Sequence, residues 1–173
     1  MSSYFNTSIK IAQQDTVNDG YICYVDENNG IVKASGKFIK KQRIELSKLT
    51  DMTVSANTPQ NIPFDSAMMA QGLSWNNSDT VTINRDAVFM IDCAVNVTSS
   101  GGATWRFQLN RNGVEMPTFT QQRVGGNQNT NSITASTHCI CSHLQNDLIT
   151  LTAECDNNRT LENVNITLRF VEI

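Results

Sequence analysis

Residues 88–97 read Val-Phe-Met-Ile-Asp-Cys-Ala-Val-Asn-Val, and this stretch decides the fold. From its second residue onward, every second position is apolar. Because successive side chains of a β-strand point to opposite faces, such alternation gathers one apolar set on one side of a sheet. The stretch therefore predicts a β-strand whose core face is formed by Phe89, Ile91, Cys93, Val95 and Val97.

The opposite face of the same strand is also largely apolar. It carries Val88, Met90 and Ala94 beside Asp92 and Asn96. A strand that is apolar on both faces is usually covered on both. One cover is an opposing sheet of the same domain, and a neighbouring subunit is a candidate for the other.

Similar alternation recurs along the chain, with turn residues between the segments. Asn112-Gly113 is a tight-turn dipeptide that leads into a further strand over 114–116. Short strands that follow one another without a helical stretch between them indicate an antiparallel sandwich or barrel. We therefore predict an all-β domain over residues 52–173, with strands over 80–83, 88–97, 104–110, 133–144, 148–155 and 164–170.

A smaller region is predicted over residues 1–51. Two β-favouring runs, Gly20–Val25 and Ile31–Ser35, flank the polar stretch Asp26-Glu-Asn-Asn-Gly30, and this pattern indicates a β-hairpin. The following stretch, Lys37–Leu49, is compatible with a strand or with a short helix. Because a lone hairpin is only marginally stable in water, we expect this region to pack against another surface.

The charges of the chain are unevenly distributed. The net charge is −3, which argues against general binding to nucleic acid or to a membrane surface. All six lysines nevertheless lie between Lys10 and Lys48, and residues 31–50 hold six basic side chains against one acidic side chain, Glu45. This Lys-rich segment is either an ordinary solvated surface or a basic face that docks on an acidic partner.

The sequence shows neither a secretory signal nor a membrane-spanning segment. The N-terminal residues lack a charged start followed by an apolar run, and no apolar stretch approaches the roughly 20 residues of a membrane-spanning helix. We therefore expect synthesis in a cytoplasm.

The 5 cysteines are an odd number without the spacing of a disulfide framework, so we interpret them as reduced and mostly buried.

The metal-like cluster of the sequence is His138-Cys-Ile-Cys-Ser-His143. On a strand, Cys139, Cys141 and His143 share one face, and thiolate and imidazole groups suit zinc. A structural zinc site needs four ligands, however, and one strand supplies two or three of them in poor geometry. Cysteines in β cores usually act as small apolar side chains. We therefore predict no metal and no other cofactor.

Candidate ligand-contacting residues outside this cluster are few. Asp79 and the stretch Asp156-Asn-Asn158 offer calcium-type oxygens without an ordered ligand series. The polar loop Gly125–Asn131 is either a connector or a tip that contacts a glycan. Trp75 is the candidate for an exposed sugar-stacking ring, since Trp105 lies on the core face of its strand.

Recognisable catalytic motifs are absent from the sequence. It has no Gly-x-Ser-x-Gly elbow, no phosphate-binding loop and no His-Glu-x-x-His pair. Cys139 and Cys141 stand within a strand pattern rather than at a helix N-terminus, where a thiolate would be activated. We therefore predict that the protein is not an enzyme and has no catalytic residues. A hydrolase on the same scaffold is the weakest of the hypotheses.

In the order of its elements, the last two-thirds of the chain resembles the globular C1q/TNF-like jelly roll. Residues 88–97 resemble the central strand of that family, and Phe107-Gln-Leu-Asn-Arg-Asn-Gly113 resembles its strand followed by an Asn-Gly hairpin. Leu144–Leu151 resembles the entry into a late strand, with Asn146 in place of the usual glycine. Asn165–Ile173 resembles the closing strand.

The segment before the central strand both matches the family and departs from it. Thr80–Ile83 followed by Asn84–Ala87 resembles the family's strand and bend. The usual Gly-x-Tyr is replaced by Arg85-Asp-Ala-Val-Phe89. The resemblance implies a jelly-roll sandwich that assembles as a homotrimer through inner strand faces.

Members of this family that lack a collagen-like stalk and carry a short N-terminal anchor are similar to bacteriophage head decoration proteins, head fibres and short tail spikes. We accordingly expect a virion structural protein, made in the host cytoplasm. Its Lys-rich N-terminal region, residues 1–51, would bind another virion protein and leave the jelly roll exposed. The alternative is a receptor- or glycan-binding module of the same fold, with a host-surface glycan as partner.

Overall fold

The computed structural model describes residues 19–25, 32–99, 101–124 and 131–173, and the regular elements in these ranges are β-strands. The chain divides into two compact units, residues 1–40 and 41–173. The sequence pattern placed this boundary at residue 51 instead. The difference arises because strand β3 (Arg43–Lys48) is hydrogen-bonded into a sheet of the second unit. No helix in the described ranges is long and apolar enough to span a membrane.

The smaller unit contains the predicted β-hairpin. Strands β1 (Asp19–Val25) and β2 (Val32–Ile39) pair antiparallel along the whole of β1. The second strand continues to Ile39 rather than ending at Ser35 as predicted. The predicted turn, residues 26–30, lies outside the described residues.

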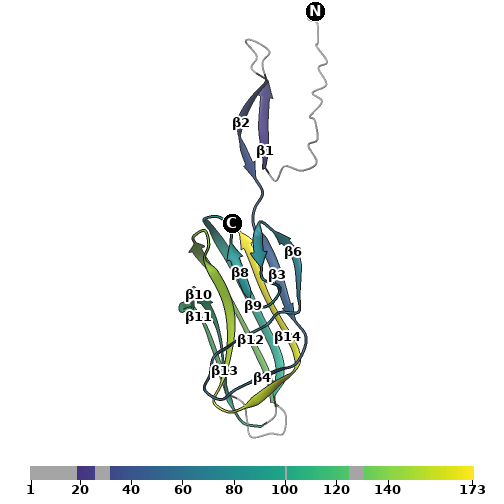
Figure 1. The fold of residues 1–173 in the computed structure, drawn as a ribbon, viewed down its shortest axis with the longest axis vertical. Coiled ribbons are helices and arrows are strands. Elements are labelled where there is room, and N and C mark those ends of the chain that lie inside the picture. Colours follow the sequence, from purple (N-terminus) through teal and green to yellow (C-terminus); the bar gives the residue numbers. More distant parts are fainter. Residues whose placement is uncertain (1–18, 26–31, 100, 125–130) are drawn as a thin grey trace, which may run out of the picture. The chain divides into compact units, whose positions relative to one another are not determined.

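The larger unit is a sandwich of two antiparallel sheets of six strands each (Figure 1). Besides β3, its strands are β4 (Met52–Val54), β5 (Gln60–Asn61), β6 (Ser66–Gln71), β7 (Leu73–Trp75), β8 (Thr80–Ile83), β9 (Ala87–Ser99), β10 (Thr104–Arg111), β11 (Val114–Val124), β12 (Asn131–His143), β13 (Leu148–Cys155) and β14 (Arg159–Glu172). One sheet, here called the β9 sheet, has the order β12-β9-β14-β3-β6, with β4 paired to β14. The other, the β10 sheet, has the order β11-β10-β13-β8-β7, with β5 paired to β13.

Every strand predicted from alternation in this unit is present, and the predicted all-β sandwich is confirmed. β9 lies inside its sheet because it pairs with β12 on one side and with β14 on the other. The stretch Lys37–Leu49 is not helical: its first three residues end β2, and Arg43–Lys48 form β3, which buries Ile44 and Leu46. The short strands β4 to β7 were not predicted, because they hold two to six residues without clear alternation.

The core lies between the two sheets and is lined by the faces that alternation assigned to it. The five predicted core residues of β9 are 0–5% exposed. Phe89 meets Phe170 of β14 edge-on, with ring centroids 6.2 Å apart. Trp105 stacks on Phe107 within β10 and is fully buried, as its place on the core face predicted. Each large apolar side chain buried in this way contributes about 1.5–3 kcal/mol, so the interior is the main stabilising element of the sandwich.

The predicted Asn112-Gly113 turn joins β10 to β11. Both residues have positive φ, 53° and 78°, which Asn and Gly tolerate and which matches the twist of a two-residue hairpin. The Asn112 side chain donates from Nδ2 to Asp147 Oδ1 at 2.8 Å and accepts at Oδ1 from the Leu148 N–H at 2.8 Å. One residue therefore fixes both the hairpin and the start of β13.

Candidate functional site on the open face of the β9 sheet

The face of the β9 sheet that points away from the core, here called the open face, has an apolar end. Cross-strand register places Met90 of β9 between Ile140 of β12 and Val171 of β14. Val88 lies on the same side of β9, and its carbonyl accepts a hydrogen bond from the Ile173 N–H at 3.1 Å. Ile140 is 60% exposed, Ile173 55% and Val88 39%. The apolar side chains predicted to face away from the core on β9 are thus joined by others from two neighbouring strands.

A row of charged and titratable side chains crosses the open face next to the apolar end. Register aligns His138 of β12 with Asp92 of β9, and the two side chains meet at 2.7 Å between Nδ1 and Oδ1. Arg169 of β14 lies opposite Asp92 in the register and opposite Glu45 of β3. The row lines a depression of about 610 Å³. From β9 to β3 the charges alternate, with Asp92, Arg169 and Glu45 in turn, so a facing surface has to match a fixed charge pattern.

Small side chains follow beyond the charged row. Ser136 of β12 and Thr167 of β14 both lie opposite Ala94, and Thr167 lies opposite Ser47 of β3. Ala94 points away from the core, as the sequence predicted. Short side chains let a second backbone approach closely. The open face is therefore graded from an apolar end through a charged row to small and polar side chains.

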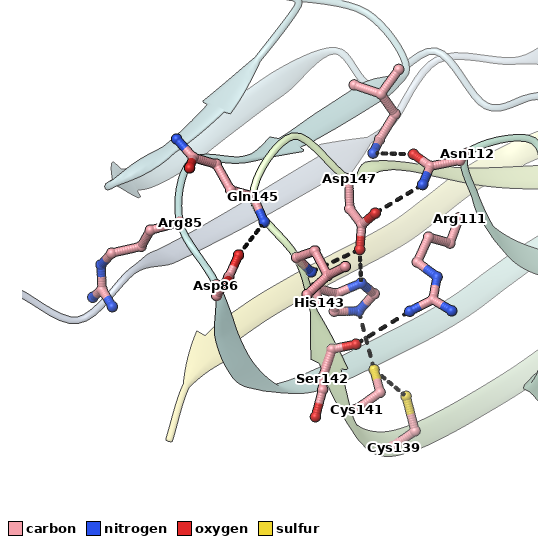
Figure 2. A network of polar contacts seen from close by, with 12 residues as sticks. Arg85, Asp86, Arg111, Asn112, Cys139, Cys141, Ser142, His143, Gln145 and Asp147 are labelled. Atoms are coloured by element: carbon pink, nitrogen blue, oxygen red, sulfur yellow. Dashed lines mark hydrogen bonds and ion pairs between the residues drawn. The ribbon is translucent and has the colours of Figure 1, made fainter.

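The predicted metal-like cluster on β12 is divided between the two faces of the strand. Cys139, Cys141 and His143 share one face, as predicted, and that face points to the core, whereas His138 lies on the open face. Figure 2 shows the core-side group, in which His143 Nε2 lies 3.2 Å from Cys141 Sγ and the two sulfur atoms are 3.8 Å apart. Within the described ranges, no group of three or more His, Cys, Asp or Glu side chains is arranged to hold a metal ion.

The electrostatics of the core-side group suit packing rather than nucleophilic chemistry. Burial raises the pKa of the Cys139 thiol to about 12 and also raises the pKa of Cys141. Burial lowers the pKa of His143 and outweighs the opposing effect of Asp147, whose Oδ2 lies 3.5 Å from Nδ1. The two thiols are therefore protonated and the imidazole neutral at pH 7, so this core-side group contains no reactive thiolate. His143 packs with Phe89 at 6.1 Å between ring centroids and closes this end of the core.

The other predicted ligand-contacting residues are held in local contacts. The carboxylate of Asp79 accepts hydrogen bonds from three neighbouring side chains at 2.7–2.9 Å. The stretch Asp156–Asn158 belongs to a different turn, after β13. Trp75, expected to be exposed, is instead half-buried against the core, and its ring N–H donates to the Ser78 carbonyl at 3.1 Å. The predicted polar loop 125–131 lies outside the described residues except for its last position, which begins β12.

Comparisons with known proteins address the fold. No family model matches the sequence, and no curated protein matches it. The structure of murine APRIL at pH 5.0 is similar with a TM-score of 0.58, at 13% identity, over 78% of this chain and 100% of that one. The globular domain of zebrafish complement 1qA is similar with a TM-score of 0.51, at 10% identity, over 77% and 96% of the two chains. Eiger TNF from S. frugiperda is similar with a TM-score of 0.54, at 8% identity, over 77% and 92%.

The fold is a TNF/C1q-like jelly roll. The resemblance inferred from the order of the strands is therefore confirmed at the level of fold, and these low identities show the fold alone.

Within this TNF/C1q-like jelly roll, sequence reasoning found only part of the open face. It identified the apolar residues of β9 that point away from the core, because alternate positions of a single strand lie on the same face. It did not bring Ile140, Arg169 and Glu45, which come from three other strands, onto the same face as these residues. The sequence did indicate that each of them points away from the core, because each alternates with core residues along its own strand. Only the register between strands, however, brings them into rows with β9.

Proposed function

We propose that this protein is a non-enzymatic, homotrimeric virion structural protein in which the open faces of three jelly rolls pack together. The observation that carries the assembly is the apolar end of the open face, where Ile140 is 60% exposed and lies in the same patch as Val88 and Ile173. Contiguous apolar surface of this kind marks interaction sites on soluble proteins. Packing of other copies of the chain over this end removes its apolar area from water, which favours association.

Two further features support assembly through this face. The small side chains beyond the charged row, Ala94 and Ser136 among them, allow close approach of a facing surface. The charge pattern of the row restricts how a facing surface can align with the open face. TNF/C1q-family jelly rolls are homotrimeric, which supports three copies rather than two.

The proposed virion role rests on the division of the chain into two units. Residues 1–40 form a compact unit of their own, and four of the six lysines, Lys10, Lys33, Lys37 and Lys40, belong to it. We propose that this unit attaches to an acidic surface of another virion protein, on the head or the tail of a bacteriophage, after synthesis in the host cytoplasm. The jelly roll is then the exposed part. A recognition module of the same fold is the second candidate, supported by a polar groove on the β10 sheet.

Light scattering of the full chain tests the assembly. The expected mass is about 58 kDa, three times the 19.2 kDa of one chain. Ile140→Lys should reduce the mass to that of a monomer, because a buried unpaired ammonium group is costly at an interface. The thermal midpoint of the isolated fold should stay unchanged, since Ile140 is exposed within one chain. Val114→Lys, at a residue that is 69% exposed on the other sheet, is the matched control and should remain a trimer.

A wild-type chain that is monomeric at micromolar concentration would overturn the assembly proposal. The virion role has its own test, immunogold labelling of phage particles with an antibody against the jelly roll. Labelling on the head or the tail is expected. Label that stays with soluble material and never with particles would remove the virion role while leaving the trimer in place.

A further inference from the structure

A polar groove of about 530 Å³ lies on the face of the β10 sheet that points away from the core. Its floor is built by β10 and β13, where register sets Gln108 opposite Thr152 and Asn110 opposite Thr150. Asn61, which lies opposite Thr152 on β5, stands at its edge. The lining is dominated by amide and hydroxyl groups. This hollow is here called the outer groove.

The floor of the outer groove is held in one arrangement by its own hydrogen bonds. Thr152 Oγ1 donates to the Gln108 carbonyl at 3.2 Å and accepts from Asn110 Nδ2 at 3.2 Å. Asn110 Oδ1 accepts in turn from Gln108 Nε2 at 3.4 Å. Gln108 is only 6% exposed, so its amide is anchored in the sheet. Each amide keeps donor and acceptor capacity beyond these bonds, and a preorganised group loses little entropy when a ligand binds.

The charged side chains at the end of the outer groove are paired with one another and include more carboxylates than cations. Arg106 lies 2.5 Å from Glu115 between Nη2 and Oε1, and 3.6 Å from Glu154 between Nη1 and Oε2. Two carboxylates therefore face one guanidinium group. Because carboxylates exceed cations here, this end of the groove disfavours a phosphate, a sulfate or another anionic group.

Apolar side chains contribute little to the outer groove. Pro59 and Leu148 are the large apolar residues of its lining. A protein partner usually needs an apolar or aromatic centre that excludes water, and this lining provides none. A ligand rich in hydroxyl groups fits it better, because each amide or hydroxyl group of the floor then exchanges water for an equivalent hydrogen bond.

We propose that the outer groove binds a neutral oligosaccharide, with the side-chain amides of Gln108 and Asn110 and the hydroxyl group of Thr152 hydrogen-bonding to sugar hydroxyl groups. A sugar hydroxyl both donates and accepts, and a side-chain amide offers a donor beside an acceptor. The inference deepens the recognition role and does not depend on the virion role. Trimeric assembly would present three such grooves and strengthen binding to a glycan-coated surface through multivalency.

The test uses the full-length chain on an array of immobilised neutral oligosaccharides and their sialylated and sulfated counterparts. Signal is expected on neutral glycans. Asn110→Ala and Thr152→Val should bind at least about tenfold more weakly, the effect of one well-placed hydrogen bond to a ligand. Thr152→Val keeps the shape of the side chain, so an unchanged thermal midpoint assigns the loss to the hydroxyl group. Asn157→Ala removes an exposed amide outside the groove and should bind like the wild type.

Three outcomes would overturn the proposal. They are the absence of binding to any neutral glycan, binding confined to anionic glycans, and undiminished binding by both groove variants. Capture of peptides on a parallel peptide array, lost in the same two variants, would assign the groove to a protein partner instead.

Calorimetric titration of the best-binding soluble glycan into Ile140→Lys separates this proposal from the assembly proposal. The affinity per chain should equal that of the wild type, whatever the oligomeric state, because the groove lies within one chain. A loss of affinity in this variant would show that the binding site needs a second subunit, contrary to the inference.

Discussion

The Lys48 ammonium group lies 2.9 Å from the Asp65 carboxylate, and Lys48 is only 4% exposed. The same carboxylate accepts hydrogen bonds from the N–H groups of Leu49 and Thr50 at 2.6 and 2.9 Å. Burial alone would raise the pKa of Asp65, but these bonds and Lys48 outweigh it and lower the pKa to about 2. Lys48 belongs to the Lys-rich segment that was expected to meet a partner, yet its charge is used inside the jelly roll to hold the end of β3.

Removal of Asp65 is therefore expected to destabilise the jelly roll far more than its exposed position suggests. Asp65→Ala leaves the Lys48 ammonium group buried without a carboxylate and with the Thr50 hydroxyl as its remaining acceptor, which should lower the free energy of unfolding by about 3 kcal/mol. Urea unfolding followed by circular dichroism measures this change. Lys48→Met is the matched control, because it removes the charge and keeps an apolar stem of similar length. It should cost less than about 1 kcal/mol. Equal losses in the two variants would contradict the role given to the ion pair.

The buried imidazole of His143 predicts a loss of stability in mild acid. Burial holds its pKa in the folded state below the ordinary value of 6.5, so the unfolded chain takes up a proton before the folded chain does. Stability from this group is complete above pH 6.5 and is lost as the pH falls toward the lowered pKa. The thermal midpoint should fall more between pH 7.5 and pH 5 in the wild type than in His143→Gln, which has no titrating side chain.

The second histidine of the chain provides the control for this pH effect. His138 lies on the open face, so His138→Gln leaves the buried imidazole of His143 in place and should keep the decrease in the thermal midpoint that His143 causes between pH 7.5 and pH 5. Both variants are measured with the additional Ile140→Lys change, so that a pH-dependent change of oligomeric state does not alter the thermal midpoint. An equal decrease in His143→Gln and His138→Gln would rule out His143 as the source of the pH dependence.

Truncation should distinguish the boundary at residue 40 from the predicted boundary at residue 51. A chain of residues 41–173 keeps β3 and should unfold cooperatively near the midpoint of the full-length protein. A chain of residues 52–173 loses Ile44 and Leu46, which are 1% and 0% exposed, and uncovers one edge of β14. Loss of two buried side chains removes about 3–6 kcal/mol, enough to abolish a cooperative transition in most domains of this size.

Circular dichroism melting of the two truncated chains measures the difference. Similar midpoints for 41–173 and 52–173 would show that β3 is dispensable and would restore residue 51 as the boundary.

Local sequence was sufficient for most strands of the jelly roll and for one of its turns. Period-two alternation identified β9, β10, β13 and β14, because a sheet that buries one face leaves that pattern in the strand itself. The Asn112-Gly113 turn was readable because positive φ at both positions restricts the residue types. The order of these elements was enough to suggest the family of folds, which the similar structures confirm.

Residue-level surroundings were decided only by the tertiary structure. Trp75 was expected to be exposed and is half-buried, and Lys48 was expected to meet a partner and is buried beside Asp65. Neither environment follows from neighbours in the sequence.

By itself the sequence determined which side chains share a face of a strand, since that depends on the backbone period alone. It did not determine which strands lie side by side, and therefore neither the rows of the open face nor the outer groove. His138 and Arg169 lie 31 residues apart in the chain, and both flank Asp92 because β12 and β14 pair with β9 in one particular register. A shift of one residue would turn each of these side chains to the other face, so the long-range pairing of the strands decides the site.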